Sequence, residues 1–181
     1  MKIMNTKILR QWRYLLLVVF CPLAFAISSE AAELYENVKI DNGQLHIITT
    51  EHREILPSKR TYKLGDEILV QTYFEKAMIS DDKTTIGWLA EYPNCCTSYP
   101  IPLELIIFRN GDILHVFTGT RLPIWKWKFE NKGTRVAFEQ ETVHGDLGIH
   151  YELRDIKTGD LIDSYDGEPQ PDAPQWVRDL K

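Results

Sequence analysis

The chain has 181 residues, 44% of them hydrophobic, and a formal charge of −5. This length favours a single domain that can bury a core of its own. The excess of acidic side chains argues against nucleic-acid binding, because phosphate groups would be repelled.

The first 26 residues have the pattern of a secretory signal peptide. Four basic residues and no acidic residue accompany an apolar run that begins at Tyr14 and ends at Ala24-Phe25-Ala26. Small residues at the first and third of these positions are typical of a cleavage site. The run is too short for a membrane anchor, which needs about 20 apolar residues. A lipoprotein with Cys21 as the lipidated residue is disfavoured by the bulky Phe20 before it.

We therefore predict a signal peptide at 1–26 and an exported protein, periplasmic or secreted. Removal of the four basic residues would leave 17 basic and 26 acidic side chains, a formal charge of −9. No further apolar stretch is long enough to cross a bilayer, so we predict no membrane span in the mature chain.

Residues 27–36 are predicted to form a mobile leader, and residues 37–167 a single β domain. Turn signals such as Asn42-Gly43 and Asn110-Gly111 separate runs rich in β-branched and aromatic residues. The predicted strands are 38–40, 45–49, 68–74, 84–92, 103–108, 113–117, 124–129, 135–138, 149–156 and 161–165. Residues 168–181 are predicted as a Pro-rich linker and a tail with one turn of helix.

An internal repeat organises the second half of the chain. The segment LELIIFRNGDILHVFTG at 103–119 matches YELRDIKTGDLIDSYDG at 151–167, and ISDDKTTIGWL at 79–89 matches FENKGTRVAFE at 129–139. Each copy contains a short strand, a polar turn, a strand that ends in an aromatic residue, a variable loop, a long strand, a Gly turn and a return strand. This order predicts two four-stranded antiparallel meanders.

Each copy resembles a blade of the β-propeller repeat families, of the WD-repeat and TolB-like kind. The resemblance covers about residues 76–167 and implies two blade-like sheets, at about 76–119 and 121–167, packed face to face. Typical propellers have four to eight blades, so the resemblance implies local blade packing, with residues 37–75 covering an open side. The residues that carry it are Ser80-Asp81-Asp82-Lys83, Ile86, Trp88, Asn131-Lys132-Gly133, Val136, Phe138 and the turn Asp155–Gly159.

The predicted fold class is therefore all-β, with two blade-like meanders packed together, N-terminal strands and a short C-terminal helical turn. Trp125, Trp127 and Phe129 alternate along one predicted strand and should share a face. We predict that these three rings fill the space between the two sheets.

Two adjacent cysteines, Cys95 and Cys96, remain after removal of the signal peptide. They could form a vicinal disulfide in an oxidising compartment, or stay as reduced thiols buried like small hydrophobes. An intermolecular bridge is a third alternative. The pair lacks the spacer usual between metal ligands, so we predict neither a metal site nor a cofactor.

The segment EQETVHGDLGIH at 139–150 occupies the same place in the second copy that the cysteine loop occupies in the first. If the two sheets pack as neighbouring blades, both loops should emerge on the same side. This convergence defines the predicted binding residues: Cys95, Cys96, Tyr99, His144, Asp146 and His150.

The sequence contains no nucleophile motif, no phosphate-binding Gly loop and no C-x-x-C pair. The leading hypothesis is a non-enzymatic binding module for a protein or an envelope component, because loops on rigid scaffolds commonly carry recognition. Alternatives are an inhibitor or immunity-type protein and a small hydrolase that uses a thiol–histidine pair. We predict no catalytic residue.

Overall fold

The computed structural model describes residues 32–94, 98–120, 123–144 and 147–180. Cys95, Cys96 and Asp146, together with the predicted signal peptide, lie outside these described residues. All of the described residues belong to one unit, Ala31–Lys181.

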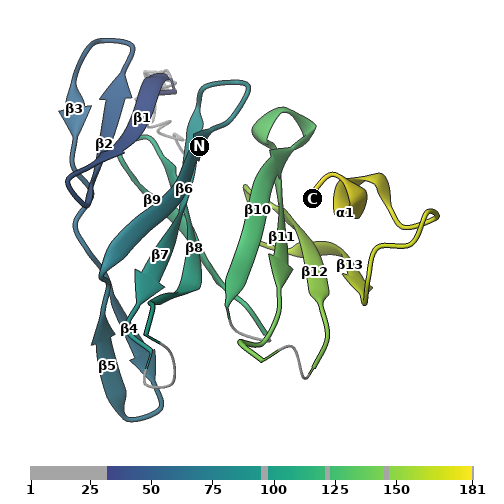
Figure 1. Cartoon of the computed structure of the whole chain (residues 1–181). Helices are drawn as coiled ribbons and strands as arrows, with labels where there is room; N and C mark the ends of the chain where they lie inside the picture. The colour runs from purple at the N-terminus through teal and green to yellow at the C-terminus, as the bar shows by residue number, and fades with distance from the viewer. Residues whose placement is uncertain (1–31, 95–97, 121–122, 145–146, 181) are drawn as a thin grey trace, which may run out of the picture. The chain divides into compact units, whose positions relative to one another are not determined.

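Two four-stranded antiparallel sheets form the centre of this unit (Figure 1). In each sheet, every strand pairs with the next strand in the chain, so both are meanders. This confirms the predicted all-β fold class. The first sheet contains β6 (Tyr73–Ile79), β7 (Thr85–Tyr92), β8 (Ile101–Arg109) and β9 (Asp112–Thr118). The second contains β10 (Ile124–Glu130), β11 (Arg135–Gln140), β12 (His150–Asp155) and β13 (Leu161–Asp166).

The N-terminal strands form two smaller antiparallel sheets. A three-stranded sheet contains β1 (Tyr35–Asp41), β2 (Gln44–Thr49) and β3 (Glu54–Ile55), and a hairpin contains β4 (Thr61–Leu64) and β5 (Glu67–Val70). β1 begins inside the range 27–36 that we predicted as a leader, and Tyr35 is buried.

The predicted strand 68–74 is interrupted in the structure. Its first part belongs to β5 and its last part to β6, because the chain leaves the hairpin at Gln71 and joins the first sheet at Thr72. The backbone N–H of Gln71 donates to Arg60, whereas that of Thr72 donates to Glu91.

Both predicted Asn-Gly turns connect antiparallel strands. Asn42 and Gly43 have φ of 49° and 75°, and Asn110 and Gly111 have φ of 52° and 79°. Positive φ at both central positions matches the twist of the flanking strands, which explains why Asn-Gly is favoured there.

Three apolar clusters cover the faces of the two sheets. One cluster lies between the N-terminal strands and the first sheet and contains Tyr35, Leu45, Trp88 and Phe108. A second, which contains Leu89, Leu105, Trp127, Val136 and Phe138, lies between the two sheets. A third joins the second sheet to the C-terminal tail, which contains α1 (Gln175–Arg178). Its members are Ala137, Tyr151, Leu153, Ala173, Val177 and Leu180.

The prediction that Trp125, Trp127 and Phe129 share one face is wrong for Trp125. A β-bulge between Ile124 and Lys126 inserts Trp125 as an extra residue. Trp127 and Phe129 pack between the two sheets, as predicted, whereas Trp125 packs against the cluster on the other face of the first sheet.

The same glutamate is buried in both copies of the repeat. Glu104 in β8 accepts hydrogen bonds from Tyr92 Oη at 2.5 Å and Arg60 Nε at 2.9 Å. Glu152, the equivalent residue in β12, accepts bonds from Arg154 Nε at 2.6 Å and Gln140 Nε2 at 2.8 Å. Since both carboxylates have charged and polar partners, we interpret them as structural residues that fix the layers.

Candidate functional site

The described members of the predicted site lie on two loops and one strand. Tyr99 is exposed in the connection between β7 and β8, and His144 is exposed in the connection between β11 and β12. His150 is the first residue of β12 and is half-buried. The cysteine pair and Asp146, as stated above, lie outside the described residues.

His150 is held by the second sheet. Its Nδ1 lies 2.9 Å from Asp166 Oδ1 on the paired strand β13, and its Nε2 lies 3.5 Å from Glu152 Oε1. These contacts hold the imidazole between two carboxylates, so His150 supports the loop rather than extending from it.

The two loops leave the sheets at the same end. β7 and β11 run in the same direction, and the connections that follow them lie at the lower end of the view in Figure 1. Val143, one residue before His144, packs against the cluster that contains Tyr92 and Ile101. These two residues pair directly before and after the first loop.

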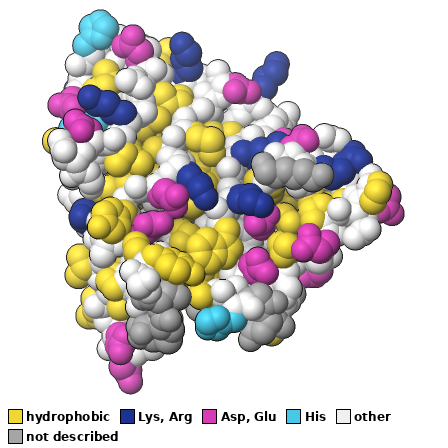
Figure 2. Space-filling view, in the orientation of Figure 1, with side chains coloured by type: hydrophobic (Ala, Val, Ile, Leu, Met, Phe, Trp, Pro, Cys, Tyr) yellow, Lys and Arg dark blue, Asp and Glu magenta, His cyan; other side chains and the backbone are white. Residues whose placement is uncertain are grey.

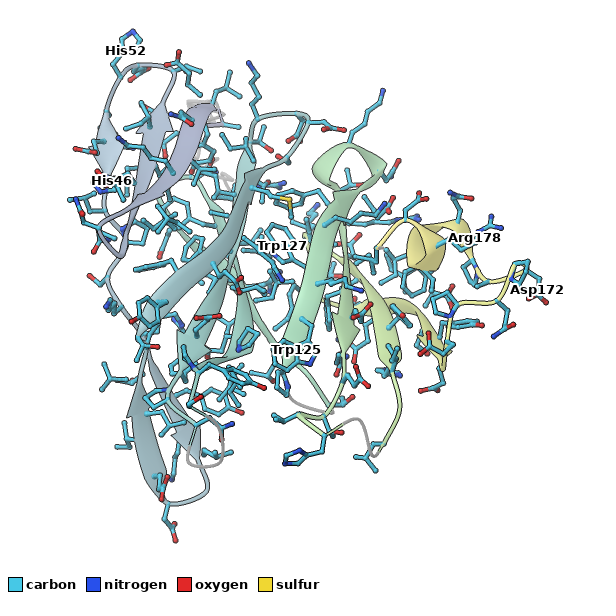
Figure 3. All side chains as sticks on the ribbon, viewed as in Figure 1. His46, His52, Trp125, Trp127, Asp172 and Arg178 are labelled. Carbon is cyan, nitrogen blue, oxygen red and sulfur yellow. The ribbon has the colours of Figure 1, made fainter. Side chains whose placement is uncertain are left out.

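Exposed apolar side chains accompany this end of the sheets. Tyr99 is 51% exposed and Leu147, in the second loop, is 62% exposed. Tyr73, paired with Glu91 near the end of β7, is also exposed. Figure 2 shows hydrophobic side chains gathered between the two sheets toward the same end, where Figure 3 labels Trp125. Exposed apolar residues near one another are typical of protein-binding surfaces.

Two carboxylates lie close together on the first sheet. Since Tyr73 pairs with Glu91 and Glu75 with Leu89, Glu75 and Glu91 are diagonal neighbours on adjacent strands. Burial, together with a hydrogen bond and charge repulsion from Glu75, raises the pKa of Glu91 to about 7, against the opposing effect of the Lys76 ammonium.

A cleft of about 430 Å³ lies between β6 and β10, with Lys76, Lys126 and Lys128 around it and Trp127 in its wall. Figure 3 labels Trp127 between these strands. Each lysine already has an acceptor: the Trp125 carbonyl at 2.6 Å, Glu139 at 3.0 Å and Glu130 at 2.6 Å, respectively. Of these three contacts, only the one from Lys76 to the Trp125 carbonyl crosses from the first sheet to the second.

Sequence reasoning missed Glu75, Glu91 and the lysine cleft. The closeness of the two glutamates depends on the strand register, which the alternation of residues does not determine. The alternation of Lys126 and Lys128 with aromatic residues was visible in the sequence, but their partners Glu139 on β11 and Asp179 in the tail are distant from them in the chain.

Two observations concern metal binding and membrane spanning in the described ranges. No group of three or more His, Cys, Asp or Glu side chains in them is arranged to hold a metal ion. No helix in the same ranges is long and apolar enough to cross a membrane.

No protein-family model matches this chain. No curated protein matches it either. Among solved structures, it is similar to a eukaryotic initiation factor, with 10% identity, a TM-score of 0.47, and coverage of 78% of this chain and 31% of that chain. It is also similar to the hydrazine synthase of Kuenenia stuttgartiensis, with 15% identity, a TM-score of 0.43, and coverage of 75% and 34%. The chain thus spans about a third of each, and at these scores neither likeness says what this chain does.

Proposed function

We propose that this protein is an exported, non-enzymatic binding module for a protein or an envelope component. Its recognition face would be the end of the two sheets where the β7–β8 and β11–β12 connections emerge. Tyr99, His144 and Leu147 are the described members of this face, and Cys95, Cys96 and Asp146 belong to the same two connections.

The observation that carries the proposal is the position of both connections at one end of a rigid pair of sheets. Hydrogen-bonded strands on either side hold the connections, so their side chains can be presented with little loss of conformational freedom. Tyr99 and Leu147 provide the apolar contact area that protein partners use.

The repeat also supports a narrower proposal about architecture. We infer that the first and second sheets are propeller-type blades, because each meander repeats the same strand order and the two share an apolar interface. The N-terminal strands and the C-terminal tail occupy the outer faces, where further blades of a propeller would otherwise pack.

Export rests on the predicted signal peptide at 1–26. Cell fractionation with mass spectrometry of the N-terminus tests it. We expect the exported form to begin after Ala26, whereas a cytoplasmic protein that retains residue 1 would contradict export.

Co-purification from the exported fraction tests the recognition face. Tyr99→Glu with Leu147→Glu should abolish capture of any specific partner, because two desolvated contacts would be replaced by charges. The matched control is Leu161→Glu, on an exposed leucine at the opposite end of the second sheet. Two outcomes would reject this face. One is an equal loss of partner capture in the double variant and in Leu161→Glu. The other is capture of the wild-type partners by both the double variant and His144→Ala.

A further inference from the structure

The hairpin of β4 and β5 leaves one strand edge uncovered. β5 pairs with β4 and with no other strand among the residues that the structure describes. Figure 1 shows the hairpin at the margin of the drawn fold, with β5 as its outer strand. A free edge presents backbone N–H and C=O groups that can pair with another strand.

The register of the hairpin shows which backbone groups face outward. Leu64 pairs with Glu67 across a two-residue turn, and the Gln71 N–H donates to Arg60 at 2.9 Å. Hydrogen-bonded pairs alternate with non-hydrogen-bonded pairs in antiparallel ladders. Leu69 therefore bonds to β4, whereas the N–H and C=O groups of Ile68 and Val70 point to the free edge.

The side chains of these two residues are also uncovered. Ile68 is 70% exposed and Val70 is 58% exposed, while Leu69 between them packs against the core of the first sheet. A groove of about 680 Å³ runs along this edge, with Tyr73 and Pro93 in its lining. Natural proteins usually protect such edges with charges, prolines or covering elements, so two exposed β-branched residues here need a partner.

We propose that β5 pairs antiparallel with β5 of a second copy, with Leu69 on the two-fold axis. This register places Ile68 of each copy opposite Val70 of the other, and these are the residues whose backbone groups face outward. The pairing joins the two hairpins into a four-stranded sheet, and it places the four apolar side chains on one face.

Charge favours a second copy as the occupant. In this register Glu67 of one copy lies opposite Gln71 of the other, so no like charges meet across the pair. Asp66, at the end of the pairing, approaches Lys59 of the other copy. The Nζ of that Lys59 donates to the Thr72 carbonyl of its own chain at 2.6 Å. The segment 59–72 of each copy therefore supplies both halves of a complementary contact.

Sedimentation velocity of the exported protein over a range of concentrations tests the proposal. We expect a concentration-dependent dimer for the wild type. Ile68→Pro removes an outward N–H and the isoleucine side chain in each copy and fixes φ at residue 68, so it should weaken dimerisation by about tenfold or more. Val70→Lys should do the same by placing ammonium groups in the apolar pair. The matched control Ile113→Lys, on exposed residue 113 of the edge strand β9, should leave the dimer intact.

A cross-link tests the register. With Cys95 and Cys96 replaced by serine, Leu69→Cys should form a disulfide-linked dimer under oxidation, whereas Leu114→Cys on β9 should not. A monomer at all concentrations, or a dimer unaffected by both Ile68→Pro and Val70→Lys, would overturn the proposal. The protein could instead be a monomer whose β5 amides gain protection from hydrogen exchange only when a different protein is added. The edge would then bind a strand of that protein and not a second copy. Because Tyr99, His144 and Leu147 do not line this groove, either proposal can fail alone.

Discussion

The missing side chain of Gly87 lets Trp127 enter the space between the two sheets. A Cβ at residue 87 would overlap the Trp127 ring, whose Nε1 is fixed 3.1 Å from the Lys76 carbonyl. Gly87→Ala should therefore lower the free energy of unfolding by about 2 kcal/mol, as overpacked cores do. Urea denaturation followed by tryptophan fluorescence measures it.

The double variant Gly87→Ala with Trp127→Leu is the control for this prediction. A smaller residue at 127 removes the overlap, so the cost of Gly87→Ala should shrink in that background. Equal costs in the two backgrounds would show that residue 87 acts through something other than Trp127.

Glu91 is the residue whose titration should change stability near neutral pH. Its pKa rises from the ordinary 4.5 to about 7 on folding. The folded state thus holds the proton more tightly, so this stabilising contribution is complete below 4.5 and is lost as the pH rises through 7. The glutamine in Glu91→Gln does not titrate, so this variant lacks the pH-dependent contribution.

Urea denaturation at about pH 5 and about pH 8 tests the sign. The free energy of unfolding of Glu91→Gln, relative to that of the wild type, should be higher at about pH 8 than at about pH 5. Glu51→Gln, on an exposed glutamate, is the matched control and should show no such gain. A pH-independent difference for Glu91→Gln would contradict the expectation.

At the scale of elements, the duplicated buried glutamates join segments by charged and polar contacts, across layers for Glu104 and within the second sheet for Glu152. Glu104 ties β8 to the segment before β4 through Arg60, and Glu152 lies on the face of β12 that meets the first sheet. Glu104→Gln should cost about 2 kcal/mol, because Arg60 loses a charged partner in a half-buried position. Glu152→Gln should cost a similar amount through Arg154.

Chemical denaturation of both variants, with Glu36→Gln on the exposed side of β1 as control, measures these costs. A neutral effect at both positions would contradict the structural role that we assign to the repeated glutamate.

The C-terminal tail is a covering element of the second sheet. Val177 and Leu180 are buried against Ala137, Tyr151 and Leu153. Leu180→Ala should therefore lower the free energy of unfolding by about 2 kcal/mol or more. The exposed-site control Leu161→Ala should change it by less than about 0.5 kcal/mol. Guanidinium denaturation compares them, and equal small effects would mean that the tail does not stabilise the sheet.

Much of the arrangement of elements could be predicted from local signals. Asn42-Gly43 and Asn110-Gly111 demand positive φ, and the repeat indicates two equivalent meanders. The bulge at Trp125 could not be predicted, because aromatic residues and lysines alternate without a break through 125–129. The contact of Arg60 with Glu104 joins distant segments, and the closeness of Glu75 to Glu91 depends on register.

For the candidate site, the sequence predicted which loops correspond but not how their residues are held. Tyr99 and His144 are exposed on these loops, whereas His150 is fixed by Asp166 and Glu152. Leu147 was not selected, because an exposed leucine in a polar loop carries no signal of its own.

At the scale of the whole described unit, the two sheets are the middle layers of a stack. N-terminal strands cover one side of the stack and the tail covers the other. Each layer buries its apolar face against the next, as in repeat proteins whose end units differ from the inner ones. Because covering layers occupy the outer faces, the proposed recognition face is assigned to one end of the sheets.

Site-specific photo-crosslinking in cells that produce the protein tests the proposed recognition face most directly. A photoreactive amino acid at position 99 should give a discrete adduct with one partner, and the same amino acid at position 161, at the other end of the second sheet, should give none. Adducts at 161 but not at 99, or the same adducts at both positions, would contradict the account.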